Sequence, residues 1–162
     1  MERQTLTTKL PESAVLDSSV VLKWFRKDEI WRDSALQRKD EIWRDSALQL
    51  RQTYLDGHML IYVPDLLIYE IANVLRYKPD LTHPQVQKAL ASLFDMQIKI
   101  IEISHGMIKT TIHLAYSYDI TVYDATFVAT AEYLKVPFIT ADEKLSEKLA
   151  DVPYVQHISL FA

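Results

Sequence analysis

Short apolar runs alternate with longer amphipathic stretches along this chain. The runs are rich in Val, Ile, Tyr and Phe, and they predict strands within residues 14–19, 60–64, 98–104, 136–140 and 154–161. The stretches between them carry apolar residues at helical spacing, and they predict helices over residues 65–77, 84–96, 105–118 and 121–134. Strands separated by helices need crossover connections. The pattern therefore predicts an α/β fold with a short, mainly parallel sheet and helices on both faces.

The length and composition are typical of a single soluble domain, which we expect to span residues 1–162. Apolar residues make up 49% of the chain and charged residues 25%. No apolar run approaches the ~18 residues of a membrane span, and residues 1–13 lack the apolar centre of a signal peptide. The chain has no cysteine, which excludes disulfides, thiolate catalysis and cysteine-ligated zinc. We therefore expect a cytoplasmic protein that does not associate with membranes.

Charge and glycine content narrow the possible ligands. The net charge is −4, so the chain as a whole does not attract nucleic acid, although a clustered metal site would reverse the sign locally. The two glycines, Gly57 and Gly106, form neither a GxGxxG nor a Walker motif. Glycine-rich loops that cradle nucleotides are therefore excluded.

One segment of 12 residues occurs twice in tandem without a change. The sequence RKDEIWRDSALQ fills residues 26–37 and again residues 38–49. On a continuous helix, a shift of 12 positions at about 100° per residue turns the second copy by roughly 120°, so the two apolar sets cannot share one stripe. We expect one copy to pack and the extra copy, taken as residues 38–49, to lie outside the catalytic core. It would serve as added length or as an arm that binds a partner.

Acidic residues follow two of the predicted strands directly. Asp17 comes after the run that begins at Ala14, and Asp142 comes after the run that ends at Ala141. Each opens a helical segment, which places both at the carboxyl edge of the sheet, where open α/β folds bind ligands. The plainer explanation is that each aspartate caps the helix that follows it, since Asp is among the best N-cap residues.

Two further carboxylates lie on helices that turn toward the core. Glu70 is four positions from Leu66 and from Val74, inside an apolar stripe where a charge needs a partner. Asp124 lies beside an inward face that begins at Phe127, although Thr121 three positions earlier also fits a capping box. Capping is a good explanation for any one of the three aspartates. It is a poorer explanation for all four acidic residues taken together.

Four carboxylates from separate elements are typical of a divalent metal site. Mg²⁺ and Mn²⁺ prefer oxygen ligands, and a cation neutralises acids that would otherwise repel one another. In phosphodiester hydrolysis, such metals lower the pKa of an attacking water and stabilise the leaving oxygen. An acidic site of this kind would attract a polyanion through its metals.

Four segments resemble, in order and spacing, the motif regions of PIN-domain nucleases, above all the VapC-like toxins of type II toxin–antitoxin pairs. They are VLDSSVVLKWF, PDLLIYEIANVL, ITVYDATFVATAEYL and VPFITADEKL, and the resemblance covers roughly residues 13–160. It implies a three-layer α/β/α sandwich. It also implies that Asp17, Glu70, Asp124 and Asp142 are the catalytic, metal-binding acids, with Thr140 and either Ser18 or Ser19 as hydrogen-bonding supports.

The resemblance further implies a Mg²⁺- or Mn²⁺-dependent endoribonuclease that cleaves RNA, forms a homodimer and is blocked by a cognate antitoxin. The duplicated segment departs from the family, which has a shorter helical hairpin there. Tyr69 and Tyr123 each precede one of the acids, and they would either stack on a nucleobase or belong to the core.

Two other functional classes stay open. A catalytically idle PIN-like module would bind RNA or protein and hold metal poorly. An aspartyl-phosphate enzyme or receiver would use Asp17 as its nucleophile or phosphoacceptor, but the sequence after Asp17 lacks the second aspartate of DxD phosphatases.

Overall fold

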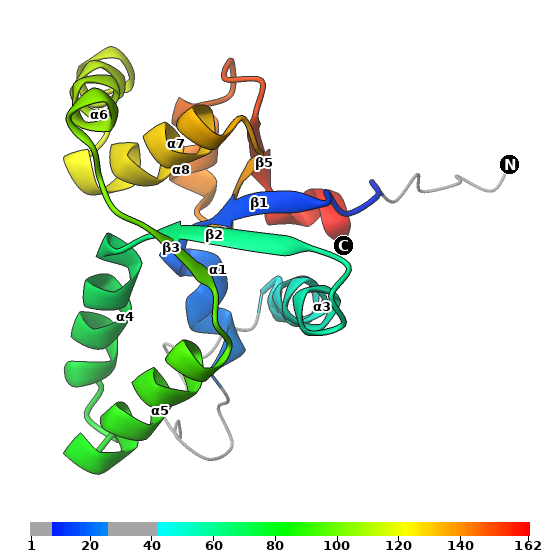
Figure 1. Ribbon diagram of the computed structural model, residues 1–162, viewed down its shortest axis with the longest axis vertical. Coiled ribbons are helices and arrows are strands. Elements are labelled where there is room, and N and C mark those ends of the chain that lie inside the picture. The colour runs from blue at the N-terminus through cyan, green and yellow to red at the C-terminus, as the bar shows by residue number, and fades with distance from the viewer. Residues whose placement is uncertain (1–7, 26–41) are drawn as a thin grey trace, which may run out of the picture.

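The computed structural model, which describes residues 8–25 and 42–162, has a parallel β-sheet between two layers of helices (Figure 1). The five strands of the sheet lie in the order β3-β2-β1-β4-β5, and every neighbouring pair is parallel. Their bounds are β1 Ser13–Leu16, β2 Leu60–Pro64, β3 Lys99–Ile101, β4 Phe138–Thr140 and β5 Val155–His157. The predicted three-layer α/β/α fold with a parallel sheet is confirmed.

The order of the strands decides which face each helix covers. The chain adds β2 and β3 on one side of β1, then returns to add β4 and β5 on the other side. Crossovers between parallel strands are right-handed, so this reversal moves the later helices to the opposite face. In Figure 1, α1, α3, α4 and α5 lie below the sheet, and α6, α7 and α8 lie above it. The reversal falls between β1 and β4, and such sheets bind ligands at the carboxyl ends of the strands on either side of it.

The described helices are α1 Ser18–Val21, η1 Leu22–Trp24, α3 Arg44–Leu55, α4 Leu66–Arg76, α5 His83–Asp95, α6 His105–Tyr118, α7 Val122–Leu134, α8 Glu143–Lys148 and η2 Ile158–Phe161, where η marks a 3-10 helix. The four whose bounds were predicted, α4 to α7, begin and end within one residue of the prediction. The last predicted strand is therefore wrong beyond His157. There the imidazole Nδ1 accepts a hydrogen bond from the backbone N–H of Ser159 (3.2 Å), which caps η2 and turns the chain out of the sheet. No helix in the described ranges is long and apolar enough to span a membrane.

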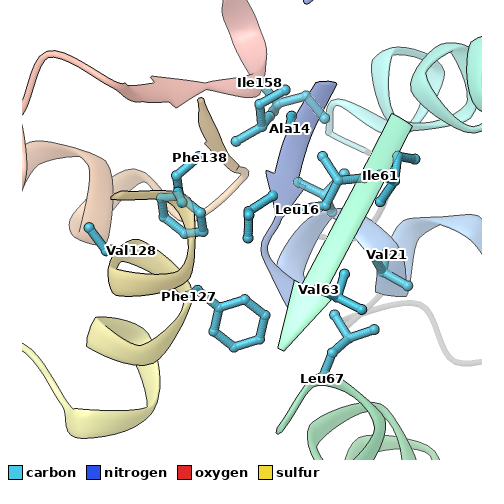
Figure 2. Packing of buried hydrophobic residues seen from close by; sticks show 14 of the residues in the cluster. Ala14, Leu16, Val21, Ile61, Val63, Leu67, Phe127, Val128, Phe138 and Ile158 are labelled. Carbon is cyan, nitrogen blue, oxygen red and sulfur yellow. The ribbon is translucent and has the colours of Figure 1, made fainter. Parts of the chain in front are cut away.

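The core packs the sheet against α7 on one face and against α1 and α4 on the other. Figure 2 shows Phe127 of α7 and Phe138 of β4 on one side of β1 and β2, with Val21 and Leu67 on the other. The two phenylalanine rings are 6.4 Å apart between centroids. Helix α7 is buried on all sides from residue 125 to 131, as expected of a helix that is apolar all round. This rigid packing fixes the direction in which the first turn of α7 presents Asp124.

Part of the second copy of the duplicated segment belongs to this core. Residues 42–49 lead into and form the first half of α3, where Ala47 is fully buried. The indole Nε1 of Trp24 donates a hydrogen bond to the carbonyl of Ala47 (2.8 Å). Of the extra copy, taken as residues 38–49 and expected to lie outside the catalytic core, Ser46 and Ala47 therefore pack into the hydrophobic core, whereas Ile42, Asp45 and Gln49 are exposed. Residues 26–41, with the whole first copy, lie outside the described residues.

Candidate functional site

Asp17 is the buried centre of the candidate site. It follows β1 and caps α1, where its Oδ1 accepts the backbone N–H of Ser18 (2.9 Å). Its Oδ2 accepts two hydroxyls, from Ser19 (2.7 Å) and from Thr140 at the end of β4 (2.8 Å). The capping explanation for Asp17 is therefore correct, and the same carboxylate also joins the two central strands at their carboxyl ends.

The hydrogen bonds around Asp17 fix the direction of each proton. The Thr140 hydroxyl accepts the backbone N–H of Asp142 (3.0 Å), and the Ser19 hydroxyl accepts that of Ala141 (3.0 Å). Both hydroxyls are thus oriented to donate their own protons to Asp17, an arrangement that suits an ionised carboxylate. The network also ties the loop after β4, and with it Asp142, to the end of β1.

The electrostatics of Asp17 oppose this hydrogen bonding. The pKa of Asp17 is raised from 3.8 to about 6, because burial and, to a smaller extent, the charges of Asp124 and Glu70 raise it by more than the bonds from Ser19 and Thr140 lower it. The carboxylate of Asp17 thus accepts hydrogen bonds that suit its charged form, but it lies at a buried position that destabilises the charge. A cation at this position would remove the conflict.

Glu70 reaches the site from α4. Its side chain is half-buried, and its Oε2 is buried without a hydrogen-bond partner. Burial raises the pKa of Glu70, hydrogen bonding with Ser18 lowers it, and the charge of Asp124 raises it. An unpartnered carboxylate oxygen is costly inside a protein, and this oxygen could ligate a cation.

Asp124 lies in the first turn of α7, on the opposite face of the sheet from α4. The hydroxyl of Thr121 accepts the backbone N–H of Asp124 (3.0 Å) and caps the helix, as the sequence suggested. Burial raises the pKa of Asp124, hydrogen bonding with Thr121 lowers it, the charge of Asp142 raises it, and that of Lys148 lowers it. Asp124 therefore combines a capping position with electrostatic contact to the other acids.

Asp142 is the most exposed of the four acids. It caps α8, and its Oδ1 accepts the backbone N–H of Leu145 (3.0 Å). Its charge acts on Asp124, so it borders the cluster without entering the buried centre. The structure thus brings Asp17, Glu70 and Asp124 into mutual electrostatic contact and places Asp142 at the rim.

These residues fit a hard divalent cation by their chemistry. They offer only carboxylate and hydroxyl oxygens, they repel one another, and one buried oxygen of Glu70 has no partner. Within the described ranges, however, no three acidic or histidine side chains are already arranged as a set of metal ligands. Like charges favour such spacing, because carboxylates brought together without a cation or a shared proton repel one another.

Two tyrosines next to these acids are more exposed than a core role allows. Tyr69, beside Glu70, has 71% of its surface exposed, and Tyr123, beside Asp124, has 63% exposed. The core alternative for both tyrosines is therefore wrong. Helical spacing could have shown this for Tyr69, because Leu67 and Ile71 on either side of it mark the buried face.

Comparison with known proteins matches the sequence and the fold. The sequence profile of the PIN domain family matches residues 14–149. A chain in a toxin–antitoxin complex from Klebsiella pneumoniae has a similar structure, with a TM-score of 0.61 and 18% identity over 90% of this chain and 97% of that one. A crystal structure of a protein from Pyrobaculum aerophilum has a TM-score of 0.59 and 17% identity over 91% of this chain and 90% of that one. No curated protein matches the sequence.

Proposed function

The chain belongs to the PIN domain family, and on this basis we propose that it is a Mg²⁺- or Mn²⁺-dependent endoribonuclease that hydrolyses RNA phosphodiester bonds. The observation that carries the proposal is the environment of the Asp17 carboxylate. Two hydroxyls and a backbone N–H hold it as an anion, while burial and two neighbouring acids raise its pKa. A structural cap would not need three further acids around it.

In this proposal, Asp17, Glu70, Asp124 and Asp142 hold the metal. A bound divalent ion would lower the pKa of an attacking water and offset the charge that develops on the phosphate. Ser19 and Thr140 keep Asp17 in one orientation, and Ser18 does the same for Glu70. Such supports lower the reorganisation that a site needs when charge develops in it.

We further propose that the protein is the toxin of a toxin–antitoxin pair. It would act in the cytoplasm as a homodimer, with RNA as substrate and a cognate antitoxin as inhibitor. Support comes from the resemblance of its four motif segments to VapC-like toxins. A second support is the similar fold of a chain in a toxin–antitoxin complex.

The test is incubation of purified protein with total RNA, with and without Mn²⁺, followed by mapping of the cut ends. We expect discrete metal-dependent cuts. Asp17→Asn and Asp124→Asn should each lower the cleavage rate by orders of magnitude while the chain stays folded, because each removes a ligand and relieves repulsion. Near-wild-type cleavage by either variant with Mg²⁺ would show that the site is assigned wrongly.

The second candidate is a catalytically idle PIN-like module that binds RNA or protein. It is favoured by one observation, the absence of a preformed set of three metal ligands among the described residues. A Mg²⁺ titration separates the two candidates. The nuclease gains thermal stability with metal and cleaves RNA, whereas the idle module does neither.

A further inference from the structure

We propose that Lys148, at the end of α8, is a positioning residue for Asp124, because it clamps the turn between α6 and α7 from which Asp124 projects. Helix α8 then serves the site at both ends, since Asp142 caps its start. The effect on metal binding and cleavage rests on the proposed function. The clamp itself is tested in the metal-free protein, so the two claims can fail separately.

The contact between Lys148 and Asp119 is the first argument. Residues 119–121 join α6 to α7, and helices α6, α7 and α8 lie on the same side of the sheet (Figure 1). The ammonium Nζ of Lys148 donates a hydrogen bond to the backbone carbonyl of Asp119 and lies 3.4 Å from its carboxylate. A cation here also suits the C-terminal end of α6, where helix carbonyls lack partners within the helix. Lys148 thus ties the end of α8 to this turn.

The turn determines how the chain enters α7 at Asp124. Asp119 has a φ of 51°, in the left-handed region that few residues other than glycine tolerate. The hydroxyl of Thr121 then accepts the backbone N–H of Asp124 (3.0 Å). Residues 121–123 are exposed, and α7 is buried on all sides only from residue 125 to 131. Asp124 therefore lies where the packed helix meets an exposed turn, and the contact from Lys148 restrains that turn.

The charge of Lys148 makes the expected effect distinctive. Burial raises the pKa of Asp124, and both hydrogen bonding with Thr121 and the charge of Lys148 lower it. Lys148 thus favours the ionised form of a proposed metal ligand. A nearby cation also repels a metal ion, so removing Lys148 would tighten metal binding if direct repulsion were its main effect. The clamp predicts the opposite, because groups that orient a metal ligand raise metal affinity.

Three variants separate these effects. Lys148→Met removes the ammonium group and keeps a long, unbranched side chain, whereas Lys148→Arg keeps a charged donor. Lys135→Met is the matched control. Lys135 is also exposed, but it caps the end of α7 that is farther from Asp124. A general effect of removing a surface lysine would appear equally in this control.

Amide hydrogen exchange in the metal-free protein measures the clamp. The amide of Ile120 donates to the carbonyl of Ala115 (3.1 Å), and that of Asp124 donates to Thr121. Both should exchange roughly 2- to 10-fold faster in Lys148→Met, as expected from the loss of one hydrogen bond. The buried amides of α7 report on the whole fold and should keep their wild-type rates. The arginine variant and the control should exchange as the wild type does.

Calorimetric titration with Mn²⁺ and cleavage of RNA then measure the consequence for the site. In Lys148→Met, Mn²⁺ affinity and kcat should each fall by roughly 10-fold, at the low end of the range for groups that orient metal ligands. The KM for RNA should stay unchanged, because Lys148 acts through Asp124 and not on the substrate. Lys148→Arg should restore both quantities.

Several results would overturn the clamp. These are wild-type exchange at Ile120 and Asp124 in Lys148→Met, tighter Mn²⁺ binding by that variant, or the same losses in Lys135→Met. A raised KM with an unchanged kcat would mean that Lys148 contacts RNA instead. Faster exchange in a protein whose wild type neither binds Mn²⁺ nor cleaves RNA would support the clamp and remove only the nuclease proposal.

Discussion

Among single residues, Asp17 is subject to the strongest opposing effects. Ser18, Ser19 and Thr140 supply three hydrogen bonds that stabilise its charge, and burial acts against that charge. Each of these residues also makes another hydrogen bond: Ser18 with Glu70, and the hydroxyls of Ser19 and Thr140 with backbone N–H groups after β4. The bonds to Asp17 are therefore not easily rearranged. The arrangement keeps a costly anion in place, which is typical of functional sites and uncommon in purely structural caps.

The fully buried Thr140 gives the first prediction. Thr140→Val removes a hydroxyl that donates to Asp17 and accepts from Asp142, so we expect a loss of about 1–2 kcal/mol in unfolding free energy. Metal affinity and cleavage should fall by roughly 10- to 100-fold, as for other supports of metal ligands. Calorimetric titration with Mn²⁺ and cleavage rates measure both.

Thr130→Val is the matched control. Thr130 is also fully buried, but its hydroxyl donates only to the carbonyl of Thr126 within α7 (2.8 Å). It should affect stability and leave metal affinity and cleavage unchanged. Equal losses of activity in both variants would show that Thr140 matters only for folding.

The pH dependence of stability gives the second prediction. The pKa of Asp17 is raised by burial from 3.8 to about 6, so protonation favours the folded chain. This stability is fully present below the unfolded pKa and is lost as the pH rises through about 6. Without metal, the protein should therefore be more stable at pH 5 than at pH 7, by about 1 kcal/mol from Asp17.

The burial-raised pKa values of Glu70 and Asp124 act in the same direction. Chemical denaturation in EDTA at several pH values measures how the unfolding free energy changes with pH, with Asp17→Asn as the comparison. The Asp17→Asn variant should lack the part of this pH dependence that comes from Asp17. An identical pH dependence in the wild type and the variant would contradict the buried charge.

At the scale of elements, the sequence predicts strands and helices well where one period dominates. Helix α6 and strand β2 match their predicted bounds, and α7 begins one residue after its predicted start. The end of the last strand was not predictable from alternation, because residues 158–161 are apolar in either conformation. The turn there depends on a bond between His157 and Ser159 that no periodicity reveals. Likewise, periodicity places Glu70 near the core but does not show that its Oε2 lacks a partner.

The duplicated segment shows why identical sequences need not be equivalent in a fold. Helix α3 continues past the second copy into Leu50, which is fully buried, and Tyr54, whose hydroxyl donates to the carbonyl of Met96 (2.8 Å). Twelve positions earlier, the first copy is followed by Arg38 and Ile42 in the corresponding places. The residues after the repeat thus favour the second copy as the start of α3.

The third prediction concerns removal of one copy. Deleting residues 26–37 or residues 38–49 produces the same chain, because the copies are identical and adjacent. The connection between Phe25 and Trp43 shortens from 17 residues to 5. Five residues still span roughly 17 Å, and the bond from Trp24 to Ala47 keeps the two ends near each other.

We therefore expect the deletion to fold and to retain metal-dependent cleavage. Size-exclusion chromatography and antitoxin binding then show whether the extra residues form an interaction surface, as expected of a partner-binding arm. An unfolded deletion, or a folded one that no longer cleaves, would mean that the inserted length shapes the site.

For the whole molecule, the reversal of strand order brings acids that are distant in sequence to one edge. Asp17 and Thr140 are neighbours only because β4 pairs with β1. The alternation of strands and helices predicts this edge, and the resemblance to PIN domains predicts which acids share it. The exposure of Asp142 depends on how its loop packs, which neither source reveals.

The fourth prediction tests the toxin role in a cell. Expression of the wild-type chain alone should arrest growth of a bacterial host, because no antitoxin is present to block it. Glu70→Gln should lift the arrest at an equal protein level, since it removes the charge of a proposed ligand and keeps its shape. Harmless expression of abundant wild-type protein would favour a housekeeping nuclease or the idle module.

The most direct test of the proposed metal site is a thermal melt at increasing Mn²⁺ and Mg²⁺ concentrations. An ion that binds the folded carboxylates and not the unfolded chain should stabilise the protein, by about 2.7 kcal/mol at a hundred times its dissociation constant. The melting temperature of the wild type should rise steadily with metal, and that of Asp17→Asn and Asp124→Asn should rise far less. A wild-type melting temperature that stays unchanged at millimolar metal, or that rises equally in both variants, would contradict a metal site built on Asp17, Glu70, Asp124 and Asp142.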